Sequence, residues 1–101
     1  MKEYISKLNK VFESRIRLGI MSVLMVNERV DFNTLKELLE ITDGNLASHL
    51  TNLEKNELII VKKQFIGRKP NTRYQATEKG KVLFRQHLDN LSKLIDSQNI
   101  K

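Results

Sequence analysis

The sequence of 101 residues contains no cysteine, only two histidines and only four glycines. Without cysteine the chain can form no disulfide, thiolate metal site or thiol redox switch of its own. His49 and His87 lie too far apart in the sequence to predict a zinc site, and the scattered glycines match no phosphate-binding glycine motif. The acidic residues are spread along expected helices, so they predict no nucleophile, base or metal cluster. We therefore expect neither an enzyme nor a cofactor.

Long apolar runs are missing as well. The longest run, Ile20 to Val26, is interrupted by Ser22 and is far shorter than the roughly 20 residues of a membrane-spanning helix. The N-terminal stretch MKEYISKLNK carries alternating charges and no apolar segment, so it does not resemble a secretory signal. With 40% hydrophobic residues the chain can bury a small core. We expect a cytoplasmic protein with one domain over residues 1–101 and no membrane partner.

Negative charge is scarce where positive charge is concentrated. The formal net charge is +6, and residues 62–81 alone hold seven basic residues against one acidic residue, Glu78. The rest of the chain is therefore neutral, and the whole excess lies in one segment. A focused positive segment of this kind attracts a polyanion.

Apolar residues recur at helical spacing in five parts of the chain. We expect a first helix over residues 2–12, a second that begins at Ser14, and a third from Asn33 through Glu40. A fourth helix over residues 43–56 should be capped by Thr42 or Asp43, and a last one, capped by Thr77, should run to about Ser97. The side chains expected to be buried by the third and fourth helices are Leu35, Leu38, Leu39, Leu46, Leu50 and Leu53. Gly19, within the second helix, predicts a close helix crossing.

The period changes from helical to extended over Leu58–Phe65 and again over Thr72–Ala76. Between these strands Gly67 can adopt backbone angles closed to other residues, and Pro70 restricts its predecessor to extended geometry. Two short helices joined by a tight turn and followed by a hairpin are the pattern of a winged helix-turn-helix. The predicted fold class is mainly α with a small β-hairpin, and residues 65–73 would form the wing.

Three stretches resemble one family. ITDGNLASHLTNLEKNELI, residues 41–59, and FIGRKPNTRYQATEKG, residues 65–80, resemble the small winged-helix transcriptional regulators related to the MarR and ArsR families. The similar branch has a recognition helix T-x-G-N-L-x-x-H-L and a wing G-R-x-P-x-T that ends in T-x-x-G. FESRIRLGIMSVL, residues 12–24, resembles the second helix of that group. The resemblance implies a homodimeric repressor or activator that binds double-stranded DNA, with dimer contacts from the first and last helices.

One position departs from that family. Asn56-Glu57 stands where the family usually has a glycine after the recognition helix. Asparagine can also adopt the left-handed conformation of a helix C-cap, so we expect the same turn here.

The helix over residues 43–56 has one apolar stripe and an opposite face of small polar side chains. Asparagine can pair with adenine, serine and threonine with several base edges, and lysine with guanine or phosphate. The residues predicted to contact the major groove are Gly44, Asn45, Ser48, Thr51, Asn52 and Lys55. His49 lies on the flank of the apolar stripe and is either a packed residue or, by the family motif, a contact to the DNA backbone.

Basic side chains at the end of a hairpin can reach phosphates or the narrow minor groove. The residues predicted to do so are Lys63, Arg68, Lys69 and Arg73. Tyr74 alternates with charged and polar neighbours and is expected on the inner face of the wing, in the core.

The last helix bears on assembly. Phe84, Leu88, Leu91 and Ile95 recur at spacings of four, three and four, as in a coiled-coil seam. This pattern fits either a simple core helix or a dimer interface of residues 84–97 with residues 1–12. The first helix would contribute Ile5, Leu8 and Phe12 to that interface. His87 is expected on the surface.

The sequence also leaves two other functions open. Winged helices also serve as protein-interaction modules, but such a module would have an apolar or acidic helix face and an uncharged wing. A non-specific nucleic-acid binder would usually be basic throughout. The sequence identifies no small-molecule effector, and a ligand would have to bind at the dimer seam.

Overall fold

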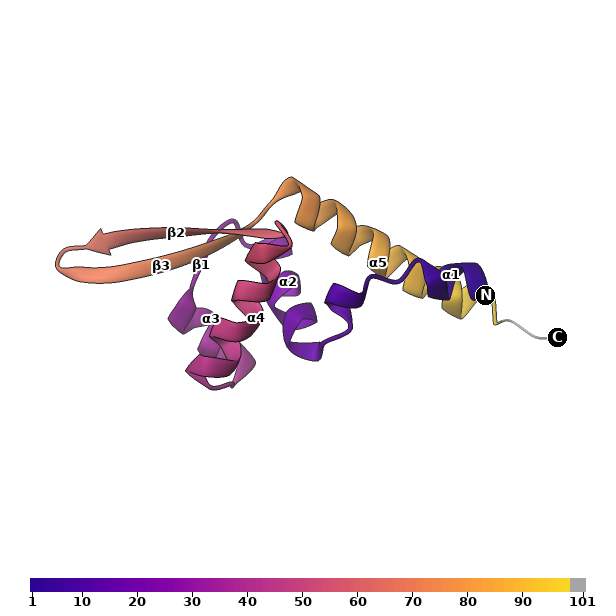
Figure 1. Cartoon of the computed structure of the whole chain (residues 1–101), viewed down its shortest axis with the longest axis horizontal. Helices are drawn as coiled ribbons and strands as arrows, with labels where there is room; N and C mark the ends of the chain where they lie inside the picture. The colour runs from indigo at the N-terminus through magenta and orange to yellow at the C-terminus, as the bar shows by residue number, and fades with distance from the viewer. Residues whose placement is uncertain (99–101) are drawn as a thin grey trace.

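The computed structural model describes residues 1–98. A central body carries a long hairpin at one end and a long C-terminal helix at the other, so the molecule measures 63 × 26 × 21 Å (Figure 1). The elements in chain order are α1 (Lys2–Ser6), the 3₁₀ turn η1 (Lys10–Phe12), α2 (Arg15–Val26), β1 (Val30–Asp31), α3 (Phe32–Leu39), α4 (Asp43–Lys55), β2 (Ile59–Ile66), β3 (Lys69–Ala76) and α5 (Glu78–Asp96). The predicted winged helix-turn-helix is confirmed.

Side-chain caps begin the main helices. The hydroxyl oxygens of Ser14, Thr42 and Thr77 each accept a hydrogen bond from a backbone N–H three residues later, as predicted. Such a cap contributes roughly 1 kcal/mol. The prediction for α3 was wrong, because Asp31 and not Asn33 caps it, through its Oδ1 atom 2.8 Å from the Thr34 nitrogen.

The single helix predicted over residues 2–12 is also wrong. α1 ends at Ser6, and Asn9 is extended, with φ −89° and ψ 120°. The Asn9 side chain accepts a hydrogen bond from the Val11 N–H and so starts the separate turn η1. Asparagine often interrupts a helix in this way because its side chain can bind its own backbone.

The helix-turn-helix of α3 and α4 packs on α2. Leu35, Leu46, Leu50 and Leu53 are buried as predicted. Leu38 is 60% exposed, against the prediction, and Leu39 is half-buried. The remaining buried side chains of this core are Phe12, Ile20, Met21, Leu24, Val30, Leu58, Ile59, Tyr74, Ala76 and Phe84.

Gly19 marks the helix crossing predicted for it. A Cβ atom at Gly19 would lie 2.7 Å from the Leu39 Cδ2 atom, so a larger residue here would require the end of the Leu39 side chain to move.

The sheet has three antiparallel strands in the order β1-β3-β2. The predicted hairpin of β2 and β3 is therefore confirmed, and the short strand β1 extends it to a three-stranded sheet. Val30 pairs with Tyr74, Asp31 with Arg73, and β2 pairs with β3 from Ile59–Ala76 out to Ile66–Lys69.

The turn after α4 places its left-handed residue differently from the prediction. Asn56 stays at φ −85°, and Glu57 takes the left-handed conformation, with φ 62°. The Leu58 N–H binds the Leu53 carbonyl and the Glu57 N–H binds the Glu54 carbonyl, which together form a Schellman motif. In that motif the left-handed residue is the one after the cap.

Leu58, Thr77 and Gly80 join the hairpin to α5. The Leu58 carbonyl accepts the Thr77 N–H at 3.0 Å, and the Thr77 Oγ1 atom accepts the Gly80 N–H at 2.9 Å. A Cβ atom at Gly80 would overlap the Leu58 carbonyl oxygen. The T-x-x-G pattern is therefore a packing requirement between α5 and the start of the hairpin.

His87 is buried, which contradicts its predicted place on the surface. Its Nδ1 atom accepts a hydrogen bond from the Asn9 N–H at 3.1 Å, and its ring packs on Phe12. Phe12 in turn meets Phe84 edge to face, with ring centroids 5.2 Å apart. These three aromatic rings fasten the N-terminal segment to α5.

No helix within residues 1–98 is long and apolar enough to cross a membrane.

Replacing Gly80 with alanine should destabilise the fold. The added methyl group has no room beside the Leu58 carbonyl, and overpacking of this kind costs roughly 1–3 kcal/mol. The matched control is Gly44→Ala, because nothing lies within 4 Å of a Cβ atom there. Urea unfolding at one fixed protein concentration measures both, and equal stability of the two variants would contradict the packing argument.

Stability should fall as the pH drops below about 6.5. Burial lowers the pKa of His87 below its ordinary 6.5, although the charge of Glu13 acts in the opposite direction. Burial also lowers the pKa of His49, and the charge of Arg17 lowers it further. The unfolded chain then binds more protons than the folded one, so this stability is complete above pH 6.5 and is lost as the pH falls through the lowered values.

Thermal unfolding between pH 7.5 and 5.5 measures the effect, since most carboxylates titrate lower. His87→Gln should be less stable at pH 7.5 but should lose less stability on acidification. A midpoint independent of pH in the parent would disprove the assignment.

Candidate nucleic-acid interface

The first turn of α4 is open to solvent. Thr42 caps the helix through its Oγ1 atom, 3.3 Å from the Asn45 nitrogen. Gly44 has nothing within 4 Å of the position of a Cβ atom. The free N–H groups and the positive end of the helix dipole there favour an approaching phosphate.

The six residues predicted for the major groove are all exposed on α4: Gly44, Asn45, Ser48, Thr51, Asn52 and Lys55. The side chains of Asn45, Ser48 and Thr51 form no hydrogen bond with any part of residues 1–98. Asn52 has only a long contact, 3.5 Å from its Oδ1 atom to the Asn56 Nδ2 atom. The donors and acceptors of this face are therefore available to a partner.

One of the two acidic residues of α4 is neutralised from α3. The Lys36 Nζ atom lies 2.8 Å from an Asp43 carboxylate oxygen. Both side chains are exposed, so the pair contributes less than about 1 kcal/mol to stability. It nevertheless cancels a negative charge beside the open first turn.

His49 is held by an arginine of α2. The Arg17 Nη1 atom lies 3.1 Å from the His49 Nδ1 atom, and Arg17 also donates from Nε to the Val11 carbonyl at 2.5 Å. A guanidinium has no acceptor, so Nδ1 must accept, and the ring is neutral with its proton on Nε2. Burial, and then the Arg17 charge, lower the pKa of His49 and keep it in this form. The Nε2–H remains as a donor.

The hairpin closes with the two residues Gly67 and Arg68. Gly67 has φ 65°, and Arg68 has no positive φ. This is the pattern of a type II′ turn, which requires glycine at its first central position and matches the twist of the strands. Lys69 is extended at the start of β3, as Pro70 predicted.

The basic residues of the wing do not share one face. Side chains alternate along a strand, so Lys63 lies on the face of the sheet that carries Val61 and Tyr74, beside α4. Lys69 and Arg73 lie on the opposite face, and Arg68 is in the turn. Tyr74 is buried, as predicted.

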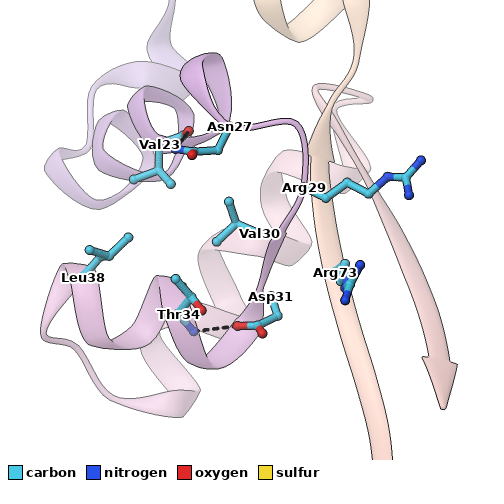
Figure 2. Close-up of a pocket in the computed structure, with 8 residues that line it drawn as sticks. All are labelled: Val23, Asn27, Arg29, Val30, Asp31, Thr34, Leu38 and Arg73. Carbon is cyan, nitrogen blue, oxygen red and sulfur yellow. Dashed lines mark hydrogen bonds between the residues drawn. The ribbon is translucent and has the colours of Figure 1, made fainter. Parts of the chain in front are cut away.

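Arg73 lines a cavity of about 390 Å³ at the base of the hairpin (Figure 2). The Arg73 Nε atom donates to the Asn71 Oδ1 atom at 3.0 Å. Hydrogen bonds from Thr34 lower the pKa of Asp31, and the charge of Arg73 acts in the same direction. Figure 2 shows Arg29 on the same side of the strands as Arg73. The sequence did not predict Arg29 for this site, because only the pairing of β1 with β3 brings it there.

The residues predicted for dimerisation fall into three groups by their burial in the protomer. Phe12 and Phe84 are buried in the core of the protomer, so the interface predicted for them is wrong in these two positions. Leu8 and Leu91 are half-buried, whereas Ile5, Leu88 and Ile95 are exposed. α5 projects beyond the body, and α1 lies along the projecting part (Figure 1).

No three histidine, aspartate or glutamate side chains of the described part of the chain come together as a metal-binding set.

Known proteins resemble this chain in sequence and in geometry. Residues 16–95 match the family model of a winged helix DNA-binding domain. An uncharacterized protein of Methanocaldococcus jannaschii is 38% identical over 92 residues, which cover 91% of this chain and 98% of that protein.

Solved structures agree with these matches. A transcriptional regulator homologue from Pyrococcus horikoshii OT3 is 30% identical, with a TM-score of 0.87 over 99% of this chain and 100% of that one. MepR of S. aureus, solved as a DNA complex, is 17% identical, with a TM-score of 0.75 over 97% of this chain and 81% of that one. At that identity the likeness to MepR concerns the fold. The predicted resemblance to winged-helix regulators is confirmed.

Proposed function

Since the chain belongs to the winged helix DNA-binding domain family, we propose that it is a sequence-specific transcriptional regulator that binds double-stranded DNA as a homodimer. Proteins of this kind act by binding and not by catalysis. Such a regulator works where the DNA is, which we take to be the cytoplasm. The proposal treats residues 1–101 as one DNA-binding domain.

The observation that carries the proposal is the free polar face of α4. The side chains of Asn45, Ser48 and Thr51 are exposed and form no hydrogen bond within residues 1–98, although each can read or contact a base edge. The stripe behind them, Leu46 and Leu50, is buried against the body. A rigid helix that offers unpaired amide and hydroxyl groups suits the major groove.

Charge supports the same partner. The excess of positive charge lies in residues 62–81, which form most of the hairpin and the first turn of α5. Arg68 in the turn and Lys69 beside it are exposed and form no ion pair within the described residues. Contacts from them to phosphates or the minor groove would add affinity with little base readout.

His49 supplies a further contact. Its Nε2–H is directed by the bond between Nδ1 and Arg17, and a neutral imidazole can donate that hydrogen to a phosphate oxygen. Gly44, in the open first turn, lets the backbone approach the DNA, and Lys55 extends the polar face at the other end of α4.

The exposed apolar part of α5 supports a homodimer. Leu88 and Ile95 are 46% and 70% exposed on the helix face that buries Phe84 one to three turns earlier. Leu88 and Ile95 form an apolar strip that a second copy can cover, and α1, which packs on α5, adds the exposed Ile5. Two recognition helices would then lie about one DNA turn apart on a palindromic site.

A protein-interaction module is the alternative function, and selection of bound duplexes from a random pool separates the two. A DNA-binding regulator should enrich a palindrome, and its affinity should fall steeply with salt through counterion release. A protein-interaction module should enrich nothing. A uniformly non-specific binder should show the salt dependence without an enriched sequence.

Substitutions in α4 and in the wing should have separable effects. Asn45→Ala, Ser48→Ala or Asn52→Ala should each cost roughly 1–3 kcal/mol on the selected duplex and relax the preference at particular base pairs. The double variant Arg68→Ala/Lys69→Ala should weaken selected and random duplexes alike, and should reduce the slope of log affinity against log salt by up to about 2.

Fluorescence anisotropy at several salt concentrations measures both sets, with unchanged thermal unfolding as the control for folding. If the α4 variants bound selected and random DNA like the parent, α4 would not read the sequence. If the wing variant kept the parental slope, the wing would be only a solubilising turn.

Introducing charge into the apolar strip should separate the dimer. Leu88→Glu/Ile95→Glu places two carboxylates on exposed positions, so the protomer should fold while association fails. Val82→Glu is the matched control, because Val82 is also exposed and apolar but lies on the other side of α5. Sedimentation should give a monomer for the double variant only. If that variant remained a stable dimer, the interface would lie on another surface of the protein.

A further inference from the structure

The tip of the wing is apolar as well as basic. Phe65 is 74% and Ile66 is 54% exposed, and Pro70 is exposed opposite Phe65. Scattered exposed apolar residues are ordinary, but two large ones in succession at the end of a hairpin favour aggregation unless a partner covers them. The basic residues alone do not account for this tip.

The register assigns these side chains to opposite faces. Phe65 and its partner Pro70 share the face of Val61 and Tyr74, and Ile66 shares the face of Arg73. On the first face, Val61, Lys63 and Tyr74 line a hollow together with Ala47, Leu50, Thr51 and Glu54 of α4. Phe65 is therefore on the side of the hairpin that faces the recognition helix.

The reach of the hairpin fits DNA. Phe65 is four residues beyond Val61, or roughly 13 Å at the rise of a strand. A major groove and the next minor groove are separated by half a helical turn, about 17 Å. When α4 lies in the major groove, the tip of a hairpin of this length arrives at the adjacent minor groove.

Charge selects the partner for this apolar tip. Lys63 lies on the same face as Phe65, Arg68 lies in the adjacent turn and Lys69 lies on the opposite face of β3, and residues 62–77 contain no acidic residue. Proteins that bend DNA insert apolar wedges, phenylalanine among them, between base pairs from the minor groove, while cationic side chains hold the adjacent phosphates. An exposed phenylalanine on a tip whose only charged side chains are cationic is suited to that role.

We propose that Phe65 inserts into the minor groove, partly unstacks one base step and bends the duplex. The inference rests on the proposed DNA-binding function. Pyrimidine–purine steps unstack most easily, so the wing would favour them at the wedge position without any hydrogen bond to a base. Phe65 would thereby determine specificity at a position that α4 does not reach.

The test uses the full-length protein and a selected duplex labelled at both ends for energy transfer. Parent protein should raise the transfer by bending the DNA. Phe65→Ala should leave the duplex straight, weaken binding by roughly 5- to 150-fold, as loss of an aromatic stacking contact does, and lose the preference for the flexible step. Phe65→Leu should restore the bend, because leucine is also a wedge residue.

Ile66→Ala is the matched control, because it removes an exposed apolar side chain from the same tip on the opposite face. It should bend and bind DNA like the parent. An equal loss in Ile66→Ala, or a straight duplex with the parent, overturns the wedge.

Failure of the wedge is distinguishable from failure of the proposed function. If Phe65→Ala bends and binds as the parent does, the wedge is wrong and DNA binding stands. If the parent binds no duplex, the proposed function fails, and the wedge with it. If Phe65→Ala keeps the parental bend and affinity but loses binding to anionic phosphatidylserine vesicles, the tip serves a lipid surface and the wedge is overturned.

Discussion

Hydrogen bonds join residues 57–58 to Thr77. The relative placement of the recognition helix, the wing and the last helix depends on them. The Glu57 carbonyl accepts the Thr77 hydroxyl at 2.8 Å, and the Leu58 carbonyl accepts the Thr77 N–H at 3.0 Å. The same hydroxyl oxygen caps α5 at Gly80, whose missing side chain leaves room for the Leu58 backbone. α4 ends, both strands of the hairpin meet and α5 begins at this one point. The three surfaces that we propose for DNA and for a second copy are therefore fixed to one another by the hydrogen bonds of the Thr77 N–H and hydroxyl groups.

Those parts of the fold that depend on near neighbours could be predicted from the sequence. The caps at Ser14 and Thr77 and the buried stripe of α4 follow from residues three or four positions apart. Contacts between distant segments could not be predicted. His87 appeared as a surface residue because its partner, the Asn9 N–H, lies 78 positions away, and Phe12 appeared as a dimer contact because helical spacing does not distinguish a core from an interface.

In the candidate site, too, the features set by near neighbours could be predicted, and those set by contacts between distant segments could not. The exposure of Asn45 and Ser48 could be predicted, because a helix that buries an apolar stripe on one side exposes the residues on its opposite side. Which face of the hairpin each side chain occupies could not be predicted without the strand register. A shift of one residue would move Lys63 to the other face of the sheet. The contact of Arg17 with His49 required the packing of α2 on α4, so the sequence left the role of His49 open.

The outer half of the hairpin has consequences for how the protein meets DNA. Near the body the strands are supported by β1 and by the burial of Ile59, Tyr74 and Ala76, whereas every residue of β2 beyond Val61 is exposed. A two-stranded ribbon without a packed face is only marginally stable in water, so its twist is set by few interactions. The type II′ turn at Gly67 still holds the register, and with it the face that carries each side chain. The wing can therefore adjust its twist to a groove without moving any side chain to the other face, while the junction at Thr77 keeps its base in line with the recognition helix.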